Sequence, residues 1–109
     1  MNETDFFADE KKIRQAAMNM LARREYSRRE LEDKLSQKFA DSSAVKLVVN
    51  RLRTENLQSD SRYIEAFIRS KIARGQGLLK IQAELLHRGI DEELFKNICL
   101  EMELSLIHI

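Results

Sequence analysis

The stretch that decides the fold runs from Arg69 to Ile90 and reads RSKIARGQGLLKIQAELLHRGI. It holds all three glycines of the chain, Gly75, Gly77 and Gly89, at the two ends of a segment with helical spacing of apolar residues. Glycine enters the left-handed conformation that closes many helices without a steric penalty. The stretch therefore predicts one helix that ends before Gly75 and a short second helix between the two glycine positions.

The apolar residues of this short helix recur at the i, i+3, i+7 and i+8 positions, the pattern of an amphipathic helix with one buried face. The polar residues between them are expected to face solvent. We expect the buried face to consist of Leu78, Ile81, Leu85 and Leu86, with Lys80, Gln82, Glu84 and His87 outside it.

The composition of the 109-residue chain favours an all-α fold. Proline is absent, and residues with high helix propensity dominate. Apolar runs are far shorter than the roughly 20 residues that span a bilayer, and the amino terminus carries acids where a signal peptide carries bases. We therefore expect a soluble, cytoplasmic protein that contacts no membrane.

Capping residues and apolar spacing place five further helices. Residues 1–10 have neither a cap nor a period and are expected to form an acidic tail, in which Phe6 and Phe7 either dock or fray. The expected helices run from Lys11 to about Arg24, from Arg28 after a Ser27–Glu30 capping box, from a cap among Asp41, Ser42 and Ser43 to about Glu55, from a cap at Ser59 or Asp60 to about Ile72, and onward from a cap at Asp91.

The two halves of the chain repeat with an offset of 50 residues. Each half is therefore predicted to be a three-helix unit, and such units stack as tandem repeats in an elongated, right-handed or curved helical array. The predicted divisions are 1–10 (tail), 11–57 (first repeat), 58–103 (second repeat) and 104–109 (second tail). The identical pairs are Ala16/Ala66, Arg24/Arg74, Leu35/Leu85, Asp41/Asp91 and Lys46/Lys96.

No residue pattern indicates catalysis or a cofactor. His87 and His108 have neither metal-ligand nor triad spacing, and the single cysteine, Cys99, is expected to be a small apolar helix residue. The glycine pair follows a helix rather than a strand, and no Gly-Lys-Ser/Thr is present, which excludes a phosphate-binding loop. We expect no enzymatic activity, no metal and no cofactor.

The distribution of charge points to a polyanionic or acidic partner. Residues 1–10 hold four acids and no base, whereas residues 11–57 hold twelve bases and six acids, a local charge of +6. Arginine suits carboxylates and phosphates because its planar fork bonds both oxygens. The candidate partner-binding residues are Arg23, Arg24, Arg28 and Arg29 at the first helix-to-helix corner, Arg69, Lys71 and Arg74 at the second, and Arg88.

The same cations allow other interpretations. They either meet acidic surface on a protein or grip the phosphates of single-stranded or double-stranded DNA, and an adaptor without a polyanionic partner is a third possibility. Any one of them is equally well a solvated helix residue with an i,i+4 partner, as in the Glu30–Lys34 spacing. Tyr26 is the only aromatic residue at the first corner, fewer than a base-stacking platform needs, and Tyr63, Phe67 and Phe95 are expected in the core.

Two segments carry a family resemblance. REYSRRELEDKL (residues 24–35) and VVNRLRTENLQSDSRYIEAFIRSKIARGQGLLKIQAELLHRGI (residues 48–90) closely resemble the RecX family, the modulators of the bacterial recombinase RecA. The resemblance covers roughly residues 12–100. Its most specific positions are Arg62, Tyr63, Phe67, Ile68, Arg69, Gly75, Gly77, Ile81, Glu84, Leu85, Arg88, Gly89 and Ile90.

The resemblance implies a monomer of three-helix repeats that lies in the groove of the RecA filament on single-stranded DNA. It implies inhibition of strand exchange and ATP hydrolysis, and thereby modulation of recombination, DNA repair and the SOS response. Members of the family usually have three repeats, and this chain has room for two. We interpret the final residues, LSLIHI (104–109), as a truncated third repeat or a non-native tail.

Overall fold

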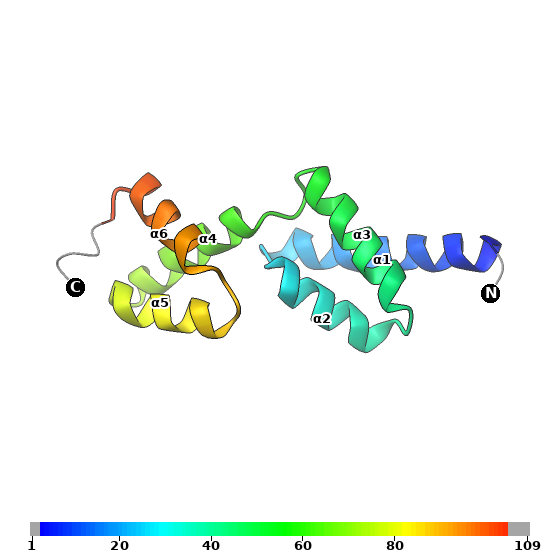
Figure 1. The fold of residues 1–109 in the computed structure, drawn as a ribbon, viewed down its shortest axis with the longest axis horizontal. Helices are drawn as coiled ribbons and strands as arrows, with labels where there is room; N and C mark the ends of the chain where they lie inside the picture. The colour runs from blue at the N-terminus through cyan, green and yellow to red at the C-terminus, as the bar shows by residue number, and fades with distance from the viewer. Residues whose placement is uncertain (1–2, 105–109) are drawn as a thin grey trace. The chain divides into compact units, whose positions relative to one another are not determined.

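The computed structural model describes residues 3–104, with the side chains of residues 9–104. Over this range the chain forms six α-helices and no strand, which confirms the predicted all-α repeat fold (Figure 1). Two compact units divide at Asp60 and Ser61. Unit 1 contains α1 (Glu3–Arg23), α2 (Arg28–Lys38) and α3 (Ser42–Thr54), and unit 2 contains α4 (Asp60–Ala73), α5 (Leu78–His87) and α6 (Glu92–Glu101), with the first residue of α4 belonging to unit 1.

The first helix begins earlier than expected. α1 starts at Glu3 rather than at Lys11, so most of the segment expected to be a tail is helical. Acidic residues are favourable in the first turn of a helix, near its positive end, and α1 has Glu3 and Asp5 there. We predicted that Phe6 and Phe7 either dock or fray, and their side chains lie outside the described residues. Residues 105–109 of the predicted second tail also lie outside them.

The predicted side-chain caps of α2, α3 and α6 form, whereas Asp60, one of the two predicted caps of α4, is the first residue of that helix. Ser27 Oγ accepts a hydrogen bond from the Glu30 N–H at 3.1 Å, and carboxylates do the same at the starts of α3 and α6. A capping box also has a return bond, in which the glutamate side chain accepts from the backbone N–H of the serine. This part of the prediction is wrong, because the Glu30 carboxylate accepts from Arg24 instead. The caps of α3 and α6 are Asp41 and Asp91.

Two of the three glycines close helices as expected. Gly75 (φ +85°) and Gly89 (φ +89°) are left-handed, and in each case the next N–H reaches the carbonyl five residues back at 3.0 Å. Gly77 differs from the prediction: with φ −82° and ψ 159° it is the extended N-cap of α5 and lacks a side-chain cap. Asn56 (φ 63°) ends α3 in the same left-handed manner as the two glycines.

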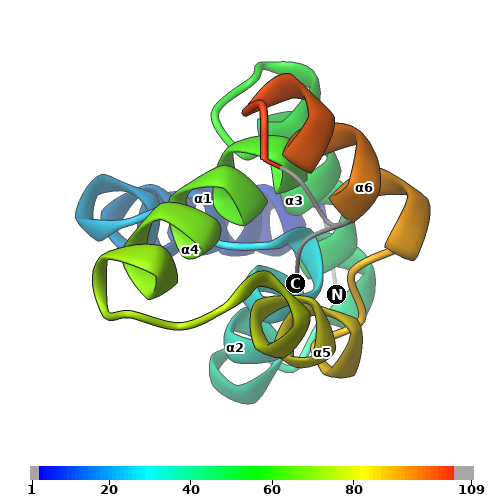
Figure 2. The same ribbon diagram turned by 90° about the vertical axis from the view of Figure 1, so that its left-hand side faces the viewer.

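Each unit has a hydrophobic core of its own. In unit 1, α3 packs against both α1 and α2. In unit 2 the core draws on residues of all three helices, α4, α5 and α6. Figure 2 shows the ribbons of these helices from a second direction. The unit 1 core comprises Ile13, Ala17, Tyr26, Leu31, Leu35, Ala44, Val45, Val48, Val49 and Leu52, and the unit 2 core comprises Tyr63, Ile64, Ile68, Leu78, Ile81, Leu85, Ile90, Phe95, Ile98 and Cys99.

Most expected core residues are buried, with one informative exception. Tyr63, Phe95 and Cys99 lie in the unit 2 core and Phe67 packs against it, as expected. Leu86, placed on the buried face of α5 by its spacing, is 40% exposed. The buried face of α5 is therefore narrower than the apolar spacing predicts, and it does not include Leu86.

Candidate partner-binding corners

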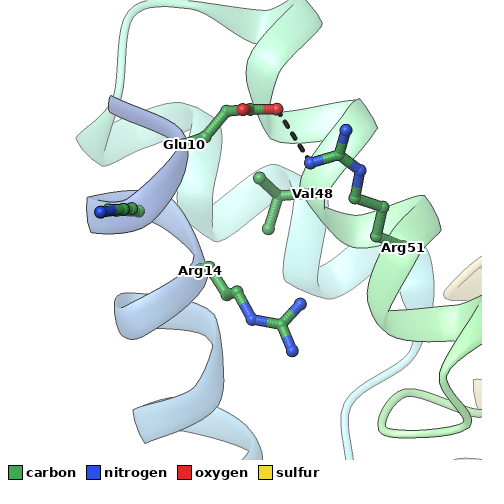
Figure 3. Close-up of a pocket in the computed structure, with 5 residues that line it drawn as sticks. Glu10, Arg14, Val48 and Arg51 are labelled. Atoms are coloured by element: carbon green, nitrogen blue, oxygen red, sulfur yellow. Dashed lines mark hydrogen bonds and ion pairs between the residues drawn. The ribbon is translucent and has the colours of Figure 1, made fainter. Parts of the chain in front are cut away.

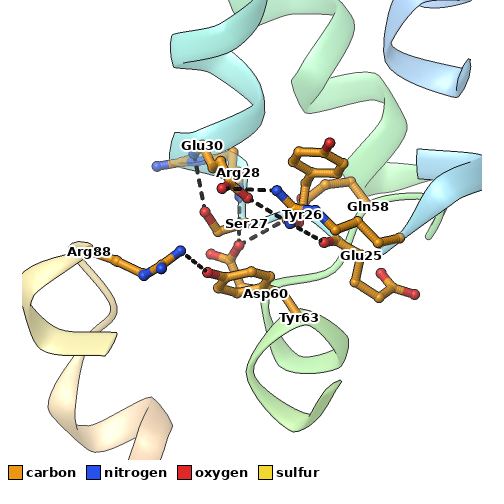
Figure 4. A network of polar contacts seen from close by, with 10 residues as sticks. Glu25, Tyr26, Ser27, Arg28, Glu30, Gln58, Asp60, Tyr63 and Arg88 are labelled. Carbon is orange, nitrogen blue, oxygen red and sulfur yellow. Dashed lines mark hydrogen bonds and ion pairs between the residues drawn. The ribbon is translucent and has the colours of Figure 1, made fainter. Parts of the chain in front are cut away.

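The first corner joins α1 to α2 and holds four of the eight predicted partner-binding residues. Arg23 is the last residue of α1, Arg24 follows it, and Arg28 and Arg29 open α2. Figure 4 shows the polar network around this connection. The network separates the four arginines into one that builds the corner and three whose side chains remain available.

Arg24 is part of the corner's structure. Its guanidinium carbon lies 3.7 Å from the centroid of the Tyr26 ring, and its two terminal nitrogens each donate to a different oxygen of the Glu30 carboxylate at 3.1 Å. It also donates to the Glu25 carbonyl at 2.9 Å. A stacked, bidentate arginine has its charge compensated and its side chain fixed, so Arg24 orients Tyr26 rather than a partner.

A buried glutamine completes the first corner, and neither apolar spacing nor capping patterns indicate it. Gln58 is 1% exposed, and its Nε2 donates to the Tyr26 carbonyl and to Asp60 Oδ1, both at 3.1 Å. The same Asp60 oxygen accepts from the backbone N–H of Arg28 at 2.8 Å. Buried polar groups are costly unless hydrogen-bonded, so these bonds stabilise the connection, while Gln58 Oε1 is buried without a hydrogen-bond partner among the described residues.

Arg23, Arg28 and Arg29 have exposed side chains that make no ion pair or hydrogen bond with the part of the chain that the structure describes. Arg28 and Arg29 also stand in the first turn of α2, where the positive end of the helix disfavours cations by about 0.3–1 kcal/mol each. Folding therefore does not explain these two charges. Their donors remain available to an anionic partner.

The second corner is paired more completely. Arg69 forms an i,i+4 ion pair with Glu65, and Lys71 Nζ lies 3.6 Å from Glu84 Oε2. Lys71 is also 5.2 Å from the centroid of the Phe67 ring, which adds a cation–π contact to the ion pair. The Arg69 pair is the i,i+4 contact that an interpretation based on solvated helix faces expects, whereas Lys71 is largely buried and its ion pair joins α4 to α5.

The last two predicted residues divide in the same way. Arg88 donates to the Tyr63 hydroxyl oxygen at 3.3 Å, and its guanidinium carbon lies 5.0 Å from the Phe67 ring centroid. Arg74, by contrast, is exposed and its side chain has no partner among the described residues. Among the eight predicted residues, Arg23, Arg28, Arg29 and Arg74 are thus the cations whose side chains make no ion pair or hydrogen bond with the described residues.

Unit 1 also contains a cavity of about 430 Å³ between α1 and α3, lined by Glu10, Lys11, Arg14, Val48 and Arg51 (Figure 3). Arg51 donates to the buried Glu10 carboxylate at 3.2 Å. Arg14 donates to both oxygens of Glu55, at 2.7 and 3.2 Å. These two ion pairs between α1 and the end of α3 have opposite polarity. Both arginines therefore already have carboxylate partners.

The ion pair between Arg14 and Glu55 shifts the pKa of both residues. The hydrogen bond from Arg14 is the main cause that lowers the pKa of Glu55 below its ordinary value, and the same bond raises the pKa of Arg14. Sequence reasoning missed this feature. The matching i,i+4 spacing of opposite charges, Glu10/Arg14 and Arg51/Glu55, is the signal that would have indicated it.

The described residues include the buried thiol of Cys99. Burial raises the pKa of the Cys99 thiol, so this residue stays protonated and is a poor nucleophile. Residues 9–104 contain no group of three or more metal-ligating side chains, and none of the helices described is long and apolar enough to cross a bilayer. Arginine forks at the corners can bind carboxylates or phosphates.

Taken together, the geometry defines a tandem three-helix repeat protein with exposed arginines at its helix corners. Residues 14–52 match the family model described as the first three-helix domain of RecX, and residues 59–96 match that of its second three-helix domain. The chain therefore belongs to the RecX family.

Curated relatives agree with this assignment. The chain is 44% identical over 80 residues to the regulatory protein RecX of Chromohalobacter salexigens, covering 73% of this chain and 53% of the relative. It is 38% identical over 93 residues to that of Halorhodospira halophila, covering 85% and 58%, and 41% identical over 83 residues to that of Legionella pneumophila, covering 76% and 55%. The chain spans about half the length of these relatives.

Proposed function

We propose that this chain binds the RecA recombinase filament on single-stranded DNA and inhibits its strand exchange and ATP hydrolysis, and so modulates recombination, DNA repair and the SOS response. The observation that carries the proposal is the match of both repeats to a family whose members are named regulatory proteins. The exposed arginines without partners supply a surface for an acidic or polyanionic assembly.

The proposed mechanism is steric and allosteric binding without chemistry. The chain occupies the filament groove, holds neighbouring subunits in one arrangement and obstructs the duplex partner. Arg28 and Arg29 contribute most at the first corner because their charges are neither compensated by a neighbour nor explained by helix stability. We propose no catalytic residue and no cofactor.

Reversing both charges, in the variant Arg28→Glu/Arg29→Glu, tests this assignment. We expect the concentration needed to inhibit RecA ATP hydrolysis to rise at least tenfold, about 1.4 kcal/mol, because close charge pairs at interfaces carry coupling energies of this order or larger. Glutamates in the first turn of α2 also suit the helix dipole, so helical circular dichroism and the unfolding temperature should not fall.

Lys12→Glu/Lys46→Glu is the matched control, since it changes the charge of unit 1 equally at two other exposed positions. It should inhibit nearly as well as the wild type. Equal inhibition by the Arg28/Arg29 variant and the wild type would remove these arginines from the interface. If the wild-type chain neither binds filaments nor inhibits ATP hydrolysis, the proposed function itself fails.

A second candidate function is direct binding of nucleic acid, favoured by the same uncompensated arginines at the first corner. Affinity for single-stranded or double-stranded DNA without recombinase would then fall steeply with salt. Each phosphate contact adds about 0.7–0.9 to the slope of log affinity against log salt concentration. Titrating the chain into filaments and, separately, into bare DNA distinguishes the two candidates, and binding to bare DNA alone would reverse their order.

A further inference from the structure

The outward face of α5 is apolar, although the same face of its counterpart α2 is polar. Leu79 is 56% exposed and Leu86 is 40% exposed, and Ala83 between them is exposed as well. Their i, i+4, i+7 spacing places them in one row along the helix. We call these three residues the α5 row. The residues 50 positions earlier, which are also exposed, are Arg29, Asp33 and Ser36.

Folding of unit 2 does not account for the α5 row. The helix already buries Leu78, Ile81 and Leu85 on its other face, where they join the unit 2 core. Unit 1 has polar side chains at the corresponding positions of α2, so a three-helix unit of this kind accepts polar residues there. An exposed apolar row bordered by polar residues is typical of a surface that contacts another molecule.

The charges next to the row indicate the chemistry of that molecule. Lys80 follows Leu79 on one flank, is exposed, and has no partner among the described residues. His87 lies on the same flank, about two helical turns beyond Lys80. The acid of α5, Glu84, is engaged by Lys71. The uncompensated charge at the border of the row is therefore the cation of Lys80, and a complementary surface combines apolar with acidic side chains.

We propose that the α5 row is a docking surface for an amphipathic helix of a protein partner, whose apolar side chains cover Leu79, Ala83 and Leu86 and whose acidic side chains meet Lys80. Helices commonly pack against one another through rows of side chains spaced three and four residues apart, so an amphipathic helix suits this row. Leucine side chains offer nothing to phosphates, so the row does not suit a nucleic acid. The inference rests on the proposed function in taking the partner to be a protein, and it adds a contact separate from the arginine corners.

The test uses the full chain and two designed helical peptides of about 18 residues, long enough to form a helix. Both have a leucine face, flanked by glutamates in one and by lysines in the other, and binding is followed by fluorescence anisotropy. We expect the wild type to bind the glutamate-flanked peptide at least tenfold more tightly than the lysine-flanked one. Leu79→Ser/Leu86→Ser should lose at least tenfold in affinity, and Lys80→Glu should reverse the preference.

Leu100→Ser is the control, because it removes a leucine that is 73% exposed on α6 and leaves the row intact. It should bind like the wild type. Equal affinity of the wild type for the two peptides, or an unchanged affinity in Leu79→Ser/Leu86→Ser, would overturn the proposal. So would wild-type self-association in sedimentation that this double variant abolishes, since the occupant would then be a second copy of the chain.

Filament binding separates failure of this inference from failure of the proposed function. Normal binding of Leu79→Ser/Leu86→Ser to RecA filaments would overturn the row as a contact and leave the proposed function standing. Absence of wild-type binding to filaments would overturn the proposed function, and the peptide comparison would still decide whether the row recognises an acidic amphipathic helix.

Discussion

Arginines close together in the sequence do different work in this protein. Arg24 stacks on Tyr26 and holds Glu30 with two hydrogen bonds, whereas Arg28 and Arg29 extend into solvent at the positive end of α2. A count of charges treats all three as equivalent. Only the first is explained by folding, so the other two are the better candidates for contacts with a partner.

Two neighbouring glycines should respond to substitution with opposite signs. Gly75 is left-handed (φ +85°) and Gly77 is extended, and an added Cβ meets no atom within 4 Å at either position. Gly75→Ala should therefore destabilise the protein by about 1–2 kcal/mol through backbone strain alone. Gly77→Ser should stabilise it by about 0.5 kcal/mol, because serine restricts the unfolded chain and caps α5 as Ser27 caps α2.

Urea unfolding followed by circular dichroism measures both effects. The midpoint should fall for Gly75→Ala and rise for Gly77→Ser. Shifts of the same sign would show that the two positions do not differ in backbone conformation as described.

At the scale of single residues, sequence patterns predicted the caps and the helix-closing glycines but not the partners of most cations. Caps and glycine closures depend on backbone geometry within a few residues, which local sequence encodes. The bond of Gln58 to the Tyr26 carbonyl joins two separate connections, 32 positions apart in the sequence. Such pairings follow from tertiary folding, and no periodic pattern indicates them.

At the scale of helices, α1 is held to α3 by apolar packing and by the two ion pairs of opposite polarity. Glu10 and Arg14 on α1 face Arg51 and Glu55 at the end of α3. The hydrogen bond from Arg14 lowers the pKa of the exposed Glu55. Its contribution to stability should therefore depend on pH.

The sign of this dependence follows from the lowered pKa of Glu55. A carboxyl group with a lower pKa in the folded state stabilises the protein above its ordinary pKa of 4.5, and this contribution is lost as the pH falls through the folded-state value. Glu55→Gln should thus be less stable than the wild type at neutral pH. The gap between the two should close below about pH 4.5.

Thermal unfolding of both proteins between about pH 7 and pH 3 measures this gap. Asp33→Asn is a suitable control, because Asp33 is an exposed acid of the same unit without a partner among the described residues. A wild-type curve parallel to that of Glu55→Gln throughout this range would show that the ion pair adds nothing in solution.

Helical periodicity predicted the number and order of the helices but placed Leu86 on the wrong face of α5. Leu85 and Leu86 are adjacent, so they point about 100° apart, and only one of them can reach the middle of a narrow interface. The unit 2 core takes Leu85. The width of a buried face depends on the neighbouring helices, which a pattern within one helix does not describe.

At the scale of the whole molecule, the two hydrophobic cores share no residue. Leu35 in unit 1 and Leu85 in unit 2 occupy equivalent positions and are 1% and 0% exposed. Leu35→Ala and Leu85→Ala should each destabilise their own unit by about 2–5 kcal/mol. Units of this size have marginal stability, so each substitution should open one unit selectively.

Hydrogen exchange with peptide-level resolution distinguishes the units. Leu35→Ala should reduce protection within unit 1 and leave amides of unit 2 near their wild-type rates, and Leu85→Ala should do the opposite. Uniform loss of protection along the chain in either variant would mean that the two units unfold as one cooperative body.

Because equivalent positions are 50 residues apart, each unit can serve as an internal control for the other. A substitution in one unit can be compared with its counterpart in the other at the same temperature, concentration and solvent, within a single chain. Moving Arg29, Asp33 and Ser36 onto α5, or Leu79, Ala83 and Leu86 onto α2, would transplant a surface between two nearly equivalent scaffolds. Differences in what the two units recognise can then be assigned to side chains rather than to fold.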